Sequence, residues 1–180
     1  VAENKSGRAE SVKEEIKFVL DRKHFTSVVV DGLKDGRIPL KVTHNDTKLN
    51  NVLFDKDADE SICVIDLDTM MPGLSLYDFG DSIRFGASSA AEDEKDLDKV
   101  YCVPALYEEY VSGFLSEMKS SITDEEVKLL HDGAIMMTLE CGMRFLTDYL
   151  EGDTYFRTHY AGQNLDRTST QMKLVQDAEA

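Results

Sequence analysis

The polar residues between positions 44 and 66 combine the side chains that phosphoryl transfer requires. A carboxylate must orient or deprotonate the hydroxyl that receives the phosphoryl group, and Asp46 can do this. Magnesium prefers oxygen ligands from fixed positions, which Asn51 and Asp66 can supply. Lys48, two residues after Asp46, adds a cation that can spread the charge of the transferring group. The segment therefore favours a phosphoryl-transfer site that uses a divalent metal.

These residues also have ordinary structural interpretations. An Asp that follows an apolar run is often only a turn residue, and a Lys in a polar loop is often only solvated. For Asp46 the combination favours catalysis, because His44 lies two residues before it and Asn51 five residues after it. We expect His44 to brace the loop backbone and not to carry a proton.

Short strands must position this polar segment. Residues 52–54 and 62–65 are apolar runs that predict two strands, and the acidic residues 55–60 predict the turn that joins them as a hairpin. Residues 40–42 form a further short β-like run that leads into His44. Because Asn51 and Asp66 flank the hairpin, we expect its two strands to bring them together.

Helical periodicity dominates the rest of the chain. Thr123 and Glu126 have capping-box spacing, which predicts the start of a long helix that ends before Gly152. The other predicted helices cover residues 11–22, 25–33, 100–120 and 166–176, after a frayed end at residues 1–10. The predicted fold class is therefore α+β and mainly helical, with one small β-hairpin that carries the polar loop and Asp66.

Composition limits the classes of partner and compartment. The 180 residues are 42% hydrophobic and 31% charged, which is typical of a folded domain, and the formal net charge is −15. Such an acidic surface argues against binding to nucleic acid or to anionic membranes. No apolar stretch approaches the ~18 residues of a membrane span. The odd number of dispersed cysteines fits a reducing compartment, so we expect a cytoplasmic protein; the cysteines are Cys63, Cys102 and Cys141.

The polar segment resembles the catalytic loop of kinase-fold small-molecule phosphotransferases, a group that includes aminoglycoside phosphotransferases, choline kinases and sugar kinases. Protein kinases share the loop pattern, and Lys48 falls where their catalytic-loop Lys lies. Aminoglycoside-type members usually carry a His-Pro-Gly-like insert between the Asp and the Asn, whereas this chain reads Thr-Lys-Leu-Asn at 47–50. The chain is more similar to the bacterial N-acetylhexosamine 1-kinases, over roughly residues 40–174. The blocks that carry this similarity are HNDTKLNN at 44–51, IDLDTMMPG at 65–73, YDFGD at 77–81, LECGMRFLTDYL at 139–150 and GDTYF at 152–156.

The resemblance implies the C-terminal lobe of a protein-kinase-like fold, with ATP and Mg²⁺ as co-substrate and cofactor. It implies that Asp46 is the base toward the anomeric hydroxyl of the sugar and that Asn51 and Asp66 bind the magnesium. It also implies that Arg144 and Tyr155 contact the N-acetylhexosamine. A planar guanidinium suits hydroxyl and carbonyl oxygens, and a Tyr ring suits a sugar face. Without the resemblance, a rim ion pair and ordinary packing would explain these last two residues.

Asp78 belongs to an Asp-Phe-Gly triplet that spells the metal-binding motif of protein kinases. It lies 32 residues after Asp46, however, whereas Asp66 already ends the strand that should carry the metal ligand. We therefore expect Asp78 to be structural, in the first turn of a helix that Ser75 caps.

Residues 1–38 are expected to form the leading helices and residues 39–180 the catalytic and substrate-binding lobe. A kinase of this type also needs a β-rich nucleotide lobe, and the first forty residues contain no glycine-rich loop that would mark it. We therefore expect the chain to belong to a longer kinase and to turn over negligibly without that lobe. Two alternatives remain: an acceptor such as an aminoglycoside, choline or homoserine, or a non-catalytic interaction module. The joint presence of Asp46, Asn51 and Asp66 disfavours the module.

Overall fold

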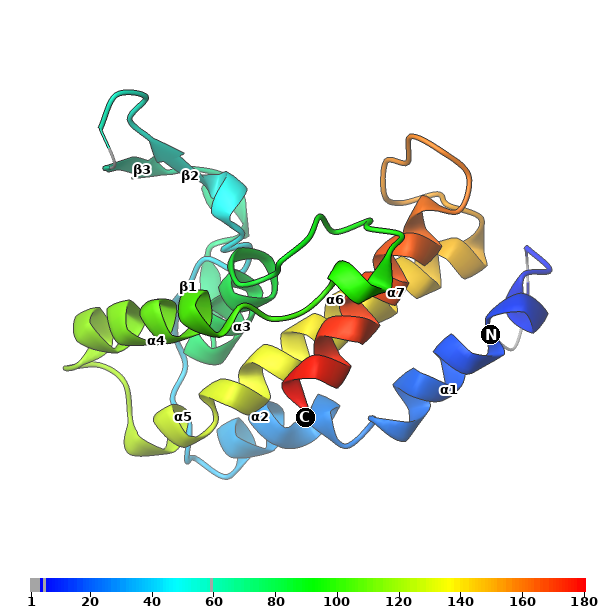
Figure 1. The fold of residues 1–180 in the computed structure, drawn as a ribbon. Coiled ribbons are helices and arrows are strands. Elements are labelled where there is room, and N and C mark those ends of the chain that lie inside the picture. The colour runs from blue at the N-terminus through cyan, green and yellow to red at the C-terminus, as the bar shows by residue number, and fades with distance from the viewer. Residues whose placement is uncertain (1–3, 5, 59) are drawn as a thin grey trace. The chain divides into compact units, whose positions relative to one another are not determined.

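The computed structural model describes residue 4, residues 6–58 and residues 60–180 (Figure 1). Within this part the chain divides into two compact units. The hairpin unit consists of Val28–Ala87 and Val103–Ala134, and the terminal unit consists of Val1–Ser27, Ser88–Cys102 and Ile135–Ala180. Helices dominate and the sheets are small, which confirms the predicted α+β, mainly helical class.

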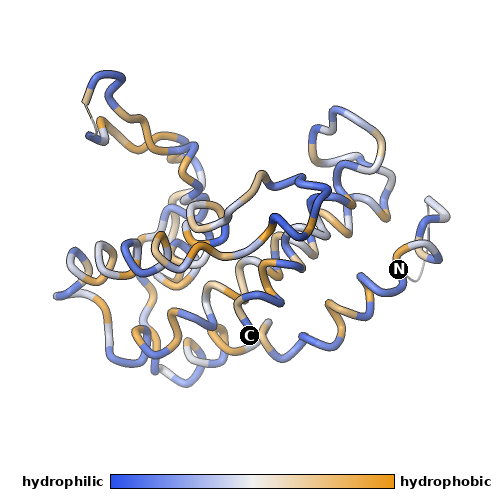
Figure 2. The backbone as a smooth tube through the Cα atoms, in the orientation of Figure 1, coloured by the Kyte–Doolittle hydropathy of each residue, from blue (hydrophilic) through white to orange (hydrophobic). Residues whose placement is uncertain are grey.

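Two antiparallel strand pairs build the framework of the hairpin unit. Strands β2 (Val52–Phe54) and β3 (Ser61–Val64) pair as the predicted hairpin, with apolar strands and a hydrophilic turn between them (Figure 2). Strand β1 (Lys41–Thr43) pairs with β4 (Met71–Gly73). The sequence pattern did not predict β4, because a Met-Pro-Gly segment has no β alternation. In the predicted acidic turn, Asp59 lies outside the described residues.

The helices of the hairpin unit are the later part of α2 (Phe25–Lys34), α3 (Ser75–Gly86), α4 (Pro104–Met118), α5 (Asp124–Lys128) and the first residues of α6 (Leu130–Glu151). Helices α3 and α4 pack through Phe79, which is fully buried. Its ring centroid lies 5.7 Å from that of Tyr110 and 5.2 Å from that of Phe114. This contact holds α3 in place, and α3 in turn contacts β1.

Two predicted helices have different bounds in the structure. Helix α4 begins at Pro104 and not at residue 100, because Pro lacks an N–H and its fixed φ suits the first helical position. The capping box at Thr123 is confirmed, but the helix it opens ends at Lys128. Leu129 has φ −98° and ψ 6°, outside the helical region, so α5 and α6 are separate helices and not one.

The terminal unit is built from α1 (Lys13–Asp21), most of α6, and α7 (Gln163–Ala178) (Figure 1). The helical periodicity at residues 11–22 and 166–176 correctly predicts α1 and α7, and α2 matches its predicted range. Phe18 and Val19 of α1 pack against two buried clusters. The first joins Val12 of the N-terminal 3-10 turn to Leu146 of α6 and Met172 of α7, and the second consists of Ile135, Leu139 and Val175.

The N-terminal residues depart partly from expectation. A 3-10 turn already begins at Ala9, so the predicted frayed end is shorter than residues 1–10, and residues 1–3 and 5 lie outside the described part of the chain. Arg22, after α1, bonds both carboxylate oxygens of Glu179 at 2.9 and 2.7 Å, which ties α1 to the end of α7. None of the described helices is both long and apolar enough to cross a membrane.

Candidate functional site

The loop after β1 is fixed in an unusual backbone conformation. Asn45 has φ +64°, a left-handed value that is uncommon for non-glycine residues, although Asn adopts it more readily than most. The carboxylate of Asp78 in α3 accepts the backbone amides of His44 and Asn45, each at 2.8 Å. The Thr47 hydroxyl donates to the backbone carbonyl of Asp78 at 2.6 Å. The first turn of α3 therefore holds the loop from one side.

Asp78 thus acts through a contact that the sequence interpretation did not foresee. It lies in the first turn of α3 as expected, but its carboxylate binds the loop amides. The predicted cap is wrong: Leu74 occupies the N-cap position, and the Ser75 hydroxyl is buried without a hydrogen-bond partner among the described residues. The resulting site is a loop anchor and not a capped helix end.

Asp46 stands at the centre of the loop with two donors. Lys48 Nζ lies 2.8 Å from Asp46 Oδ2, and Asn51 Nδ2 lies 2.9 Å from the same oxygen. The Asn51 amide also donates to the Asp46 carbonyl at 2.8 Å. Burial alone would raise the pKa of Asp46, but the hydrogen bonds from Lys48 and Asn51 and the charge of Lys48 outweigh it and lower the pKa. Asp46 is therefore a carboxylate at neutral pH.

His44 connects the loop to the segment that carries Asp66. Its Nε2 lies 3.0 Å from the carbonyl of Ile65, so Nε2 is the donor, while Nδ1 is buried without a partner in the described part of the chain. The Thr69 hydroxyl donates to the backbone carbonyl of His44 at 2.6 Å. These contacts brace the loop against the segment that carries Asp66, which is the role expected for His44.

Asn51 and Asp66 flank the hairpin but lie outside its strands. Asn51 ends a 3-10 turn directly before β2 and is 5% exposed, whereas Asp66 follows β3 in a left-handed conformation with φ +64° and is exposed. The amide of Ile65 donates to the carbonyl of Asn51 at 2.9 Å, which ties the backbone next to Asp66 to Asn51.

The donor set fits a hard divalent cation. The Asn51 nitrogen is turned to Asp46, which leaves its amide oxygen for another partner, and Asp66 adds a carboxylate. Among the described residues no group of three or more His, Cys, Asp or Glu side chains could cage a metal. Magnesium does not need such a cage, because it usually binds one or two carboxylates together with substrate phosphates and water.

Arg144 and Tyr155 lie together in the terminal unit. They line a pocket of about 230 Å³ with Met143, Thr147, Asp148, Glu151 and Phe156. The Arg144 guanidinium carbon lies 5.8 Å from the centroid of the Tyr155 ring and 5.5 Å from that of Phe156. Tyr155 is 73% exposed, so its ring is open to a ligand. The structure therefore brings both predicted sugar-contacting residues to one pocket.

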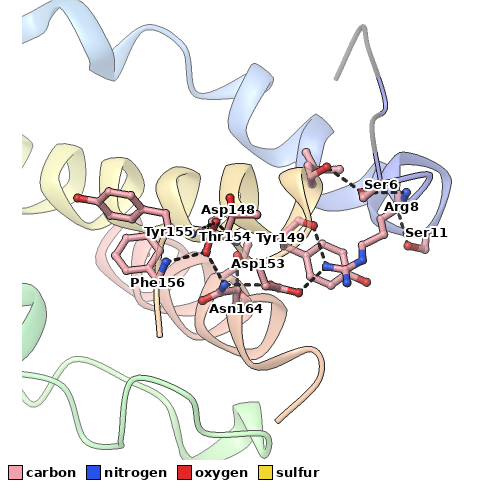
Figure 3. Close-up of polar contacts among 12 residues, drawn as sticks. Ser6, Arg8, Ser11, Asp148, Tyr149, Asp153, Thr154, Tyr155, Phe156 and Asn164 are labelled. Carbon is pink, nitrogen blue, oxygen red and sulfur yellow. Dashed lines mark hydrogen bonds and ion pairs between the residues drawn. The ribbon is translucent and has the colours of Figure 1, made fainter. Parts of the chain in front are cut away.

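Asp148 is the residue at this pocket that sequence reasoning missed. It is 3% exposed, and its carboxylate accepts the backbone amides of Thr154, Tyr155 and Phe156 (Figure 3). Burial alone would raise its pKa, but these three amides, with the side chain of Asn164, outweigh burial and lower it. The available signal is the position of Asp148 four residues before Gly152, because a glycine marks the C-terminal end of a helix and the turn that follows it.

The sequence model of a phosphotransferase enzyme family matches residues 8–111, which is more than half of the 180-residue chain. The chain belongs to this family. The matched region of this phosphotransferase contains the loop at 44–51, Asp66 and Asp78, and it ends before Arg144. Membership supports a phosphotransferase that acts on small molecules and agrees with a kinase-like α+β lobe.

Proposed function

We propose that this phosphotransferase transfers the γ-phosphoryl group of ATP, with Mg²⁺, to the anomeric hydroxyl of an N-acetylhexosamine. Family membership supports the reaction class. The observation that carries the proposal is the state of Asp46, an ionised carboxylate held by Lys48 and Asn51 in a loop of fixed backbone.

One carboxylate oxygen of Asp46 is available to the hydroxyl that receives the phosphoryl group. Lys48 and Asn51 both bond Oδ2, and no hydrogen bond within residues 4, 6–58 and 60–180 engages Oδ1. Oδ1 would accept a hydrogen bond from the acceptor hydroxyl, orient that oxygen toward the γ-phosphorus and take the proton as the new O–P bond forms. At the same time the bond between the γ-phosphorus and the bridging oxygen to the β-phosphate breaks, and ADP leaves. Because the pKa of Asp46 is low, its main contribution is orientation, and the proton moves late.

Asn51 and Asp66 would hold the magnesium that accompanies ATP, through an amide oxygen and a carboxylate. When bound, the metal neutralises charge on the β- and γ-phosphates. Asn51 would have a double role, because its nitrogen fixes Asp46 while its amide oxygen would be a ligand of the metal. Lys48 is proposed to offset the negative charge that develops near the transferring group.

The pocket at Arg144 would bind the body of the acceptor. The guanidinium offers a planar fork of donors to hydroxyl or acetamido oxygens, and the open Tyr155 ring offers an apolar face to the sugar. The pocket volume of about 230 Å³ is below the ~300–1,000 Å³ typical of sites for drug-sized ligands. One sugar ring therefore suits it better than a multi-ring aminoglycoside.

The acceptor assignment is tested by incubating the full-length protein with Mg-ATP and separate acceptors, because we expect a β-rich nucleotide lobe to be needed for turnover. The acceptors are N-acetylglucosamine, N-acetylgalactosamine, glucose, an aminoglycoside and choline. Phosphorus NMR should detect a sugar 1-phosphate with an N-acetylhexosamine. Arg144→Ala should mainly raise the KM for the sugar, by roughly tenfold for the loss of charged hydrogen bonds. Faster phosphorylation of choline or the aminoglycoside, or an unchanged sugar KM in Arg144→Ala, would contradict the acceptor assignment.

A further inference from the structure

The turn that presents Tyr155 and Phe156 has a strained start. Gly152 and Asp153, which follow α6, both have positive φ, at +100° and +61°. Glycine adopts such values freely, but Asp153 does so only at a cost in free energy. A turn of this kind keeps one conformation only if contacts outside it enforce that conformation.

Asp148 supplies those contacts and is fully occupied by them. Its Oδ1 accepts the amides of Thr154 and Tyr155 at 2.8 and 2.7 Å. Its Oδ2 accepts the amide of Phe156 at 3.0 Å and the side-chain amide of Asn164 at 2.8 Å. Each oxygen therefore already has two donors, which is the usual capacity of a carboxylate oxygen. Although Asp148 lines the pocket, its oxygens are engaged with the turn and not free for a ligand.

Asn164 and the N-terminal residue Arg8 make a second set of contacts, which stabilise the turn after α6 (Figure 3). Asn164 is fully buried and also donates to Asp153 Oδ1 at 2.9 Å. The other oxygen of Asp153 accepts from Arg8 Nη1 at 2.5 Å. Arg8 donates further to the carbonyl of Tyr149 at 2.9 Å, and its guanidinium lies over the Tyr149 ring at 4.5 Å from the centroid. Arg8 thus contacts both the last turn of α6 and the turn that follows it.

We propose that Asp148, braced by Asn164 and Asp153 and through them by Arg8, is a positioning residue of the acceptor pocket. It fixes the backbone of residues 152–156 so that the rings of Tyr155 and Phe156 stay beside Arg144 before any ligand binds. A preordered pocket loses less conformational freedom on binding, so its affinity is higher. This inference rests on the proposed function, because it assigns the pocket to the acceptor.

Arg22 offers a matched control for Arg8. Both arginines belong to the N-terminal part of the terminal unit, and both pair with an acidic residue more than 140 positions away. Both also lie over an aromatic ring, Arg22 at 3.6 Å from the centroid of Phe18. Only Arg8 contacts the turn. Arg8→Ala and Arg22→Ala therefore both remove an ion pair and a ring contact, but only the first should disturb the pocket.

The experiment compares Asp148→Asn, Arg8→Ala and Arg22→Ala in the full-length protein. We expect Asp148→Asn to raise the KM for N-acetylhexosamine at least tenfold, since an amide nitrogen cannot accept the hydrogen bonds that one oxygen accepts now. Arg8→Ala should raise it about threefold, and Arg22→Ala should leave it unchanged. The kcat and the KM for Mg-ATP should stay within about twofold of the wild type in all three variants. Amide hydrogen exchange at residues 154–156 should accelerate only in the first two.

The outcomes separate the two proposals. If Asp148→Asn does not fold, the comparison of Arg8→Ala with Arg22→Ala still tests the positioning role. Faster exchange at residues 154–156 with a wild-type sugar KM in Arg8→Ala would overturn the positioning role, as would equal KM changes in both arginine variants. A wild-type protein that neither binds nor phosphorylates N-acetylhexosamine would overturn the proposed function, and the acceptor role of the turn with it.

Discussion

Replacement of Asp78 should release the loop that carries Asp46. The Asp78 carboxylate accepts two adjacent backbone amides, those of His44 and Asn45, each at 2.8 Å. Asn45 has a left-handed φ of +64°, so the anchor holds a stretch of backbone that includes a sparsely populated conformation. Asp78→Ala removes both acceptors and leaves the two amides without a protein partner.

The size of the effect follows from the number and exposure of these bonds. An unsatisfied buried donor costs about 1–3 kcal/mol. Asp78 is half-buried, so water can partly replace the carboxylate, and we take the lower part of that range for each amide. The free energy of unfolding should therefore fall by about 2–3 kcal/mol in Asp78→Ala. Asp78→Asn keeps one acceptor oxygen and should lose about half as much.

Urea denaturation followed by circular dichroism, with linear extrapolation to water, measures this difference. Asp57→Ala is the control, because Asp57 is an exposed acidic residue of the β2–β3 turn in the same unit. It should change the free energy of unfolding by less than about 0.5 kcal/mol. If Asp78→Ala were as stable as Asp57→Ala, Asp78 would not anchor the loop, and the reasoning would be refuted.

Three further changes test other parts of the structure. Thr123→Ala removes the cap of α5 and should lower the free energy of unfolding by about 1 kcal/mol in urea denaturation; no loss would contradict the capping box. Gly73→Ala places a methyl group 2.1 Å from Thr43 Oγ1, so the same assay should show a loss of about 1–3 kcal/mol, and wild-type stability would contradict the close β1–β4 contact. Lys48→Met removes a hydrogen bond and a positive charge from Asp46, so carbon-13 NMR titration should show a higher pKa for Asp46. The folded pKa of Asp46 lies below its usual 3.8, so the ionised carboxylate stabilises the fold above pH 3.8, and this stabilisation is lost as the pH falls through the folded pKa. Lys48→Met should make that loss of stability smaller. An unchanged pKa of Asp46 in Lys48→Met would contradict the ion pair.

Much of the fold was predictable because local periodicity determines it. The stripes of apolar residues gave α1, α2 and α7 within a few residues, and the alternation of apolar runs with an acidic turn gave the β2–β3 hairpin. The predicted bounds are wrong where a single residue determines where a helix begins or ends. Pro104 delays the start of α4, and the conformation of Leu129 separates α5 from α6. Strand β4 forms because β1 is available as a partner, which the sequence of β4 itself does not indicate.

The candidate site, too, was predictable in part. The types and spacing of Asp46, Lys48 and Asn51 predicted a cluster, and the structure places Lys48 Nζ and Asn51 Nδ2 at 2.8 and 2.9 Å from Asp46 Oδ2. The supporting roles of Asp78 and Arg8 were not predictable, because they depend on contacts between distant parts of the chain. The sequence gives no sign that Arg8 meets Asp153, since 145 positions separate them. Such contacts become visible only when the tertiary structure is known.

The catalytic role of Asp46 is decided by the rate at which the full-length Asp46→Asn variant phosphorylates N-acetylhexosamine with Mg-ATP. Asn keeps the shape of the side chain but cannot accept the hydroxyl proton, and the unfolding midpoint, measured in parallel, checks that the loop still folds. We predict a rate at least about 100-fold below the wild type, as expected when the group that orients the acceptor hydroxyl and takes its proton is removed, in a protein that still unfolds cooperatively. A folded Asp46→Asn protein with a near-wild-type rate would contradict the mechanism.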